Sequence, residues 1–205
     1  MHPWEKISLS DYEAHMSLDE VFQLQQLSEI LCAQLSDYPV TTAAILGIAG
    51  GNGLEHVPAT GLKTVYGVDI NAEYLAACRE RYAQLGDRLQ LVRCDLSQPD
   101  ACLPGAELII ANLFIEYIGR NRFTSHIANA RPRYVSCVIQ QNLGEQFVSQ
   151  SPYTHVFDEI GALHSDIDEH ALSAAMQQIG YDCVLRATIP LPNAKQFVRL
   201  DYCIK

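Results

Sequence analysis

The chain has 205 residues, 48% of them apolar and 19% charged, and its formal net charge is −10. These values are typical of one globular domain. The 24 acidic residues outnumber the 14 basic ones, and no basic run occurs, which disfavours nucleic acid as a partner. No apolar run approaches the roughly 20 residues that cross a bilayer, and residues 1–6 lack the features of a secretion signal. We therefore expect a cytoplasmic protein that acts on a small molecule, with no membrane or nucleic-acid partner.

Seven cysteines are scattered along the chain, at positions 32, 78, 94, 102, 137, 183 and 203. Their number is odd and no Cys-x-x-Cys pair occurs, so their spacing fits neither a disulfide framework nor a zinc site. We expect free thiols, most of which pack as small hydrophobic groups, and no metal site.

The first helix is predicted over about residues 18–36. The segment Ser17-Leu18-Asp19-Glu20 matches a capping box, and an apolar face follows at helical spacing. That face consists of Leu24, Leu27, Leu31 and Leu35. We expect residues 1–38 to form a helical extension, with residues 39–205 as the main domain.

Short apolar segments then alternate with helical patterns. The helix after the second strand has Asn71 as its cap and Gly86 as its end. Such alternation predicts parallel strands joined by helical crossovers. Strands are expected at 43–49, 65–70, 89–94, 107–111 and 134–140, and further helices near 71–86 and 120–130.

The C-terminal part differs, because two strands follow each other with only a short turn between them. A helix is predicted over 166–179, then strands at 181–189 and 196–204 around a turn at 190–193. So short a connection requires an antiparallel pair. The sequence thus predicts an α/β fold, a Rossmann-like doubly wound seven-stranded sheet whose five parallel strands are closed by a C-terminal antiparallel hairpin.

The segment 164–170 contains two histidines and three acids, which also suggests a metal site. Asp166 and Glu169 are spaced as an N-cap and its supporting acid, however, and a helix is expected there from the apolar pattern. No ligand spacing is diagnostic, so we favour the helix cap.

A glycine-rich turn follows the first predicted strand. It contains Gly47, Gly50, Gly51 and Gly53, and Asp69 ends the next strand. Such a turn lets the backbone approach a ligand closely, and an acid at the second strand end can accept both hydroxyls of a ribose. The nicotinamide-dinucleotide pattern needs glycines at i, i+2 and i+5, and no trio here fits.

The ordered motifs over roughly residues 40–204 resemble those of class I S-adenosylmethionine-dependent methyltransferases. The glycine turn is similar to the first motif, Val68-Asp69-Ile70 to the ribose-binding motif, and Cys94-Asp95-Leu96 to the adenine-binding motif. The segment 110–117 occupies the place of the motif that borders cofactor and acceptor. The resemblance implies S-adenosylmethionine as cofactor, with a site formed by Gly47, Ala49, Gly51, Gly53, Asp69, Ile70, Asp95, Leu96, Asn112 and Leu113.

Two positions depart from the family's first motif. Gly47 replaces the usual acid, which in the family helps to hold the amino group of the methionyl moiety, and Ala49 replaces the first glycine. These changes would mean weaker cofactor binding, a substitute acid such as Glu55, or a methyltransferase-like domain that binds without catalysis.

Methyl transfer from a sulfonium requires alignment and exclusion of water, and a base only when the nucleophile must lose a proton. The candidate catalytic residues are Glu116, Tyr117 and His15. Residues 11–16 resemble the lid segments of small-molecule methyltransferases, and the loop 141–165 is expected to shape the acceptor pocket. The sequence thus predicts a methyltransferase with a small-molecule acceptor, with an NAD-dependent oxidoreductase or a non-catalytic domain as alternatives.

Overall fold

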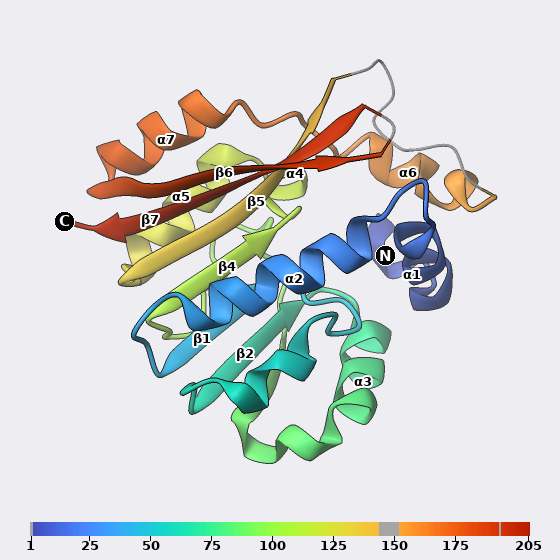
Figure 1. Ribbon diagram of the computed structural model, residues 1–205, viewed down its shortest axis with the longest axis horizontal. Coiled ribbons are helices and arrows are strands. Elements are labelled where there is room, and N and C mark those ends of the chain that lie inside the picture. Colours follow the sequence, from blue (N-terminus) through green and yellow to red (C-terminus); the bar gives the residue numbers. More distant parts are fainter. Residues whose placement is uncertain (1, 144–151, 193) are drawn as a thin grey trace.

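A seven-stranded sheet forms the centre of the molecule (Figure 1). The computed structural model describes residues 2–143, 152–192 and 194–205. The strand order is β3-β2-β1-β4-β5-β7-β6. The strands are β1 (Thr42–Leu46), β2 (Thr64–Asp69), β3 (Leu89–Arg93), β4 (Leu108–Asn112), β5 (Tyr134–Asn142), β6 (Tyr181–Leu191) and β7 (Lys195–Ile204).

The pairing confirms the predicted fold class. Strands β1 to β5 are parallel to one another, whereas β7 is antiparallel to both β5 and β6. The carboxyl ends of β1, β2 and β4 therefore meet at one edge of the sheet, where the strand order reverses around β1 and ligands bind in open α/β folds.

Helices cover both faces of the sheet (Figure 1). Successive strand residues point to opposite faces, so Leu46 and Ile109 pack with one layer, and Ile45 and Ile110 pack with the other. The first layer contains α5 and α7, and the second contains α2 and α3. The helices are α1 (Leu9–Ser17), α2 (Gln23–Ser36), α3 (Ala72–Arg81), α4 (Ile115–Ile118), α5 (Arg120–Ala130), α6 (Asp158–Gly161) and α7 (Glu169–Gln178), with 3-10 helices η1 (Pro3–Glu5), η2 (Leu54–Ala59), η3 (Ala83–Arg88) and η4 (Thr154–Phe157).

The helix predicted over 18–36 is present and ends at Ser36 as predicted, but it begins later than predicted. The helix α1 ends at Ser17, and α2 starts at Gln23 after Phe22, whose φ is +52°. The Ser17 hydroxyl donates to the carbonyl of Ala14, so it does not cap a following helix. The break lets the chain change direction so that both Met16 and Val21 are buried, and this tertiary packing outweighs the local capping motif.

Within residues 1–38, the helix α2 is an integral part of one sheet layer. Its Leu31 and Leu35 belong to the same buried cluster as Ile45 of β1. The residues before Gln23 belong to neither of the two large buried clusters that cover the sheet.

The observed N-cap of the last helix lies two residues after the predicted cap, Asp166. The helix α7 has Asp168 as its N-cap, with Oδ1 accepting from the Ala171 amide at 2.6 Å. The Asp166 carboxylate instead accepts from the side-chain amide of Asn142 at 3.4 Å. Within the described ranges no group of three metal-ligating side chains is found.

Other element ends differ by a few residues from the predictions. The helix α3 has Asn71 as its cap, as predicted, but ends at Arg81, and the 3-10 helix η3 contains Gly86. The strand β6 continues through Leu191, which shortens the turn expected at 190–193. Asn193 itself lies outside the described residues.

The cysteines are all free thiols, and they divide between interior and surface. Cys78 and Cys137 are buried as expected, whereas Cys102 and Cys183 are exposed. Among the helices of the described segments, none is long and apolar enough to span a membrane.

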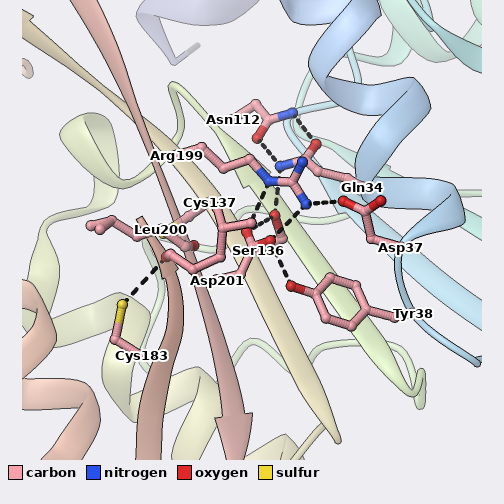
Figure 2. Close-up of polar contacts among 11 residues, drawn as sticks. Gln34, Asp37, Tyr38, Asn112, Ser136, Cys137, Cys183, Arg199, Leu200 and Asp201 are labelled. Carbon is pink, nitrogen blue, oxygen red and sulfur yellow. Dashed lines mark hydrogen bonds and ion pairs between the residues drawn. The ribbon is translucent and has the colours of Figure 1, made fainter. Parts of the chain in front are cut away.

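A buried polar cluster joins α2 to the centre of the sheet (Figure 2). The Arg199 guanidinium contacts Asp201 at 2.6 Å and Asp37 at 2.8 Å. The Asp201 carboxylate is fully buried and also accepts from the hydroxyls of Tyr38 and Ser136. Every oxygen of this buried acid therefore has a partner, as a buried charge requires.

The same cluster reaches the ligand edge of the sheet through two amide side chains (Figure 2). Gln34 of α2 donates to Ser136 at 2.8 Å and to Asn112 at 2.9 Å, and Asn112 donates back to Gln34 at 2.8 Å. This reciprocal pair fixes the Asn112 side chain at the carboxyl end of β4.

Candidate functional site

A cavity of about 750 Å³, partly open to solvent, lies at the carboxyl ends of β1, β2 and β4. We call it the first cavity. It is lined by His2, Trp4, Tyr12, Gly47, Ala49, Val68, Asp69, Ile70, Tyr74, Cys94, Asp95, Leu96, Ser97, Asn112, Leu113, Phe114, Tyr117 and Ile118.

Asp69 is held rigidly at the end of β2. Its Oδ2 accepts from the Ala49 amide and its Oδ1 accepts from the Asn71 amide, each at 2.9 Å. Burial raises the pKa of this carboxyl, against the opposing effect of these backbone donors. Each oxygen keeps a further lone pair, so the group can still accept hydrogen bonds from a ligand's hydroxyls.

The glycine-rich turn has an unusual backbone at the cavity wall. Gly47 has φ of +68°, and Ala49 has φ of +48°, a region that costs a residue with a Cβ about 1–2 kcal/mol. Leu113 directly follows β4, the neighbour of β1 in the sheet, and it also has a positive φ of +51°. Backbone strain of this kind is common at functional sites, where surrounding contacts hold a residue in its unfavourable conformation.

At position 47, where the family's first motif has an acid, the structure leaves no space for a side chain. A Cβ on Gly47 would lie 2.8 Å from Cδ2 of Phe114, closer than real Cβ contacts. The Phe114 ring therefore fills the space that a side chain at position 47 would need. Glu55, the substitute acid suggested by the sequence, bonds to Ser28 and Tyr82 and does not line either cavity described here.

Gly51 and Gly53, two of the predicted cofactor residues, do not line the first cavity. A Cβ on Gly51 would lie 2.8 Å from Tyr82, and one on Gly53 would lie 2.7 Å from Leu31. Both glycines thus allow close packing behind the turn. The segment after the turn forms only the 3-10 helix η2, which contains Pro58, a residue without an amide hydrogen.

Asp95 follows β3 and is both a turn residue and part of the cavity wall. Its carboxylate accepts from the amide and hydroxyl of Ser97 and from Gln98. Burial opposes ionisation of the acid, but these hydrogen bonds outweigh it and lower the pKa of Asp95. The adjacent Leu96 is buried and supplies an apolar surface next to the acid.

A second cavity, of about 570 Å³, adjoins the first. The two share the side chains of Trp4, Tyr12, Leu113 and Tyr117. The second cavity is lined by Trp4, Tyr12, His15, Met16, Gln23, Leu113, Glu116, Tyr117, Gln140, Phe157, Ile160, His164 and Lys195.

Glu116 is the buried acid of the second cavity, with 2% of its surface exposed. Its Oε1 accepts from the Gln140 amide at 3.0 Å, whereas Oε2 has no hydrogen-bond partner among the described residues. Burial raises the pKa of this carboxyl to about 7. A half-ionised carboxyl with one free oxygen can accept a proton near neutral pH.

Three basic side chains line the same cavity. Burial lowers the pKa of Lys195 to about 8, and burial also lowers the pKa values of His15 and His164. The sequence singled out Glu116, Tyr117 and His15, and all three lie on this cavity. It missed Lys195, since a lysine beside a hairpin turn carries no local signal of burial.

The chain before α2 closes over both cavities and is tied to the main domain. The Asn71 side chain donates to the Trp4 carbonyl at 3.0 Å, and the Tyr74 hydroxyl donates to the Ile7 carbonyl at 2.9 Å. Arg81 pairs with Glu13 at 2.6 Å. In Figure 1 this part of the chain lies beside α6, with which it shares a small apolar cluster.

That cluster places part of the predicted pocket loop at the second cavity. Phe157 and Ile160, from the loop 141–165, pack near Ile7 and also line the cavity. Residues 144–151 of this loop lie outside the described residues.

Comparison with known proteins shows the fold. No family model and no curated protein matches the sequence. Magnesium protoporphyrin IX methyltransferase from Synechocystis PCC 6803, solved with bound S-adenosylhomocysteine, is 14% identical over 96% of this chain and 94% of its own, with a TM-score of 0.69. The Burkholderia thailandensis 1,6-didemethyltoxoflavin-N1-methyltransferase is 16% identical over 100% of this chain and 91% of its own, with a TM-score of 0.62.

A putative RNA methyltransferase from Pyrococcus horikoshii is also similar, with 12% identity over 87% of this chain and 84% of its own, and a TM-score of 0.59. At such identities the likeness concerns the fold, and it does not select the acceptor. The chain therefore has the fold of class I S-adenosylmethionine-dependent methyltransferases, as its motifs predicted.

Proposed function

We propose that this protein is an S-adenosylmethionine-dependent methyltransferase whose acceptor is a small molecule. The observation that carries the proposal is the pair of adjoining cavities that share Trp4, Tyr12, Leu113 and Tyr117. Methyl transfer needs one site for the cofactor, one for the acceptor and a passage between them that excludes water.

The first cavity fits the cofactor by its chemistry. Asp69 would accept the ribose hydroxyls, and Asp95 with the apolar Leu96 would hold the adenine. Gly47 and Leu113, which line this cavity and have left-handed backbones, would border the methionyl part. When bound, the cofactor supplies an activated methyl group.

The second cavity fits a small acceptor with a flat, largely apolar body. Its walls carry the aromatic rings of Trp4, Tyr12, Tyr117 and Phe157. Trp4 and Tyr117 are in edge-to-face contact, with ring centroids 4.9 Å apart, at the junction of the two cavities. These rings would keep water away from the reacting atoms and orient the acceptor toward the methyl group.

Calorimetric titration tests the cofactor part of this proposal. We expect S-adenosylmethionine and S-adenosylhomocysteine to bind and NADH not to bind. Asp69→Asn should weaken binding by about 10- to 100-fold, since an amide cannot accept from both backbone amides and a ribose. Glu80→Gln, an exposed acid on α3, is the matched control and should bind as the wild type does.

Two results would contradict the proposal. One is the absence of binding of either cofactor form at millimolar concentration. The other is equal affinity of Asp69→Asn and Glu80→Gln for S-adenosylmethionine, with both variants folded by circular dichroism.

A further inference from the structure

Glu116, which lines the second cavity, has a carboxylate oxygen without a hydrogen-bond partner among the described residues. Glu116 is 2% exposed, and its Oε2 has no hydrogen-bond partner among the described residues. Leaving a buried acceptor unpaired destabilises a fold, and such a group calls for a specific explanation. A ligand that donates a hydrogen bond in this cavity would provide one.

The position of Glu116 separates two roles for this acid. It lines the second cavity and not the first, so it faces the acceptor rather than the cofactor. It does not replace the acid that is missing at Gly47. Its chain neighbour Tyr117 lines both cavities, so Glu116 is next to the passage through which a methyl group must travel.

The charges around Glu116 indicate whether this acid takes a proton from the acceptor or binds a cationic acceptor. Glu116 is the single carboxyl group among the described residues that line the second cavity, whereas Lys195, His15 and His164 are basic. A permanently cationic acceptor would meet the Lys195 ammonium, which disfavours it. Burial lowers the pKa values of His15 and His164 and so favours their neutral forms, which add no such repulsion. An uncharged or acidic acceptor that donates an N–H or O–H hydrogen bond to Glu116 meets no such penalty.

We propose that the acceptor carries its nucleophile as an N–H or O–H group on a flat ring, and that Glu116 takes the proton of this group during methyl transfer. This inference rests on the proposed function. The lone pair of nitrogen or oxygen forms the bond to the methyl carbon while the carbon–sulfur bond breaks and its electron pair remains on sulfur. The proton moves to Oε2 of Glu116, which becomes a neutral carboxylic acid and later releases the proton to solvent.

The acidity of Glu116 suits this role. Burial raises the pKa of the carboxyl to about 7, so a large fraction is ionised at neutral pH and is more basic than an ordinary glutamate. Other titratable groups line the same cavity: Tyr12 and His15 from α1, Tyr117 from α4, His164 after α6 and Lys195 from β7. The charge of Asp166, before α7, also raises the pKa of Glu116. A pH profile must therefore be compared with a variant that keeps all of these groups.

The test uses a panel of ring compounds in matched pairs. Each pair consists of a phenol, aniline or azole and its methylated counterpart without that hydrogen, such as 4-hydroxybenzoate with 4-methoxybenzoate and anthranilate with N,N-dimethylanthranilate. The readout is formation of S-adenosylhomocysteine together with the mass of the product. We expect methylation of N–H or O–H parents and none of their counterparts.

Variants of the full chain complete the test. Glu116→Gln keeps an acceptor for the Gln140 amide, and we expect it to lower kcat by about 100-fold or more with an unchanged Kd for S-adenosylmethionine. It should also abolish the rise of kcat/KM between pH 6 and 8. Asp158→Asn, an exposed acid on α6, is the control and should keep wild-type turnover.

Three outcomes would overturn the inference: equal turnover of the methylated counterparts, wild-type kcat in Glu116→Gln, or cofactor binding without turnover of any panel member. The absence of cofactor binding would instead contradict the proposed function. The two failures are thus distinguishable.

Discussion

Asp69 and Ala49 stabilise each other at the centre of the candidate site. The Ala49 amide donates to Asp69 at 2.9 Å while Ala49 holds a φ of +48°. In the family's motif a glycine occupies this place, where a positive φ costs little. Asp69, at the end of β2, thus also binds the turn that follows β1. This hydrogen bond stabilises the conformation of the turn, although Gly47 and Ala49 depart from the family's motif.

Glu116 predicts a pH dependence of stability. Its pKa in the folded protein is about 7, above its usual value, so between about pH 4.5 and pH 7 the folded state binds a proton that the unfolded state has released. This contribution to stability is present at low pH and is lost as the pH rises through the folded pKa. Its size is about 1–3 kcal/mol.

The measurement is urea denaturation of the wild type and Glu116→Gln at pH 5 and pH 8. The free energy of unfolding of the variant, relative to the wild type, should rise by about 1–3 kcal/mol from pH 5 to pH 8. Other groups with shifted pKa values, such as Asp69, are present in both proteins and cancel in the difference. A difference that does not change with pH would contradict the burial of an ionisable Glu116.

At the scale of elements, the polar cluster under α2 joins the helix to β5, β7 and the end of β4. Asp201 is its central anion, with Arg199 as its cation. Replacing one partner of a buried pair leaves the other charge without compensation. Asp201→Asn should therefore lower the free energy of unfolding by about 3 kcal/mol.

The control for that prediction is Asp182→Asn. Asp182 pairs with Lys205 at 3.1 Å on the surface, with about half of each side chain exposed. An exposed pair contributes about 0–1 kcal/mol, so this substitution should have little effect. Equal losses from the two substitutions in urea denaturation would refute the structural importance of the buried cluster.

At the scale of the whole molecule, the sequence predicts the sheet well and the second cavity only in part. Asp69, Asp95 and Asn112 each follow a strand, and parallel strands bring their carboxyl ends together without any knowledge of side-chain packing. Local pattern therefore suffices to bring these residues to one cavity wall.

The second cavity depends on contacts between distant parts of the chain. Trp4, Phe157 and Lys195 come from the N-terminal segment, the loop after β5 and the start of β7. No local period or motif marks such residues, since their position follows from how α1 and α6 pack over the strand ends. The late start of α2 was missed for the same reason, because burial of Met16 and Val21 outweighs the capping motif at Ser17.

The central claim is that two adjoining cavities hold a methyl donor and a small acceptor. A crystal structure of the protein with S-adenosylhomocysteine tests it most directly. We expect the ribose hydroxyls to donate hydrogen bonds to the Asp69 carboxylate. We expect the sulfur to lie beside Tyr117 and to point toward the second cavity, which Glu116 lines. A ligand bound away from Asp69, or a sulfur directed away from the second cavity, would contradict it.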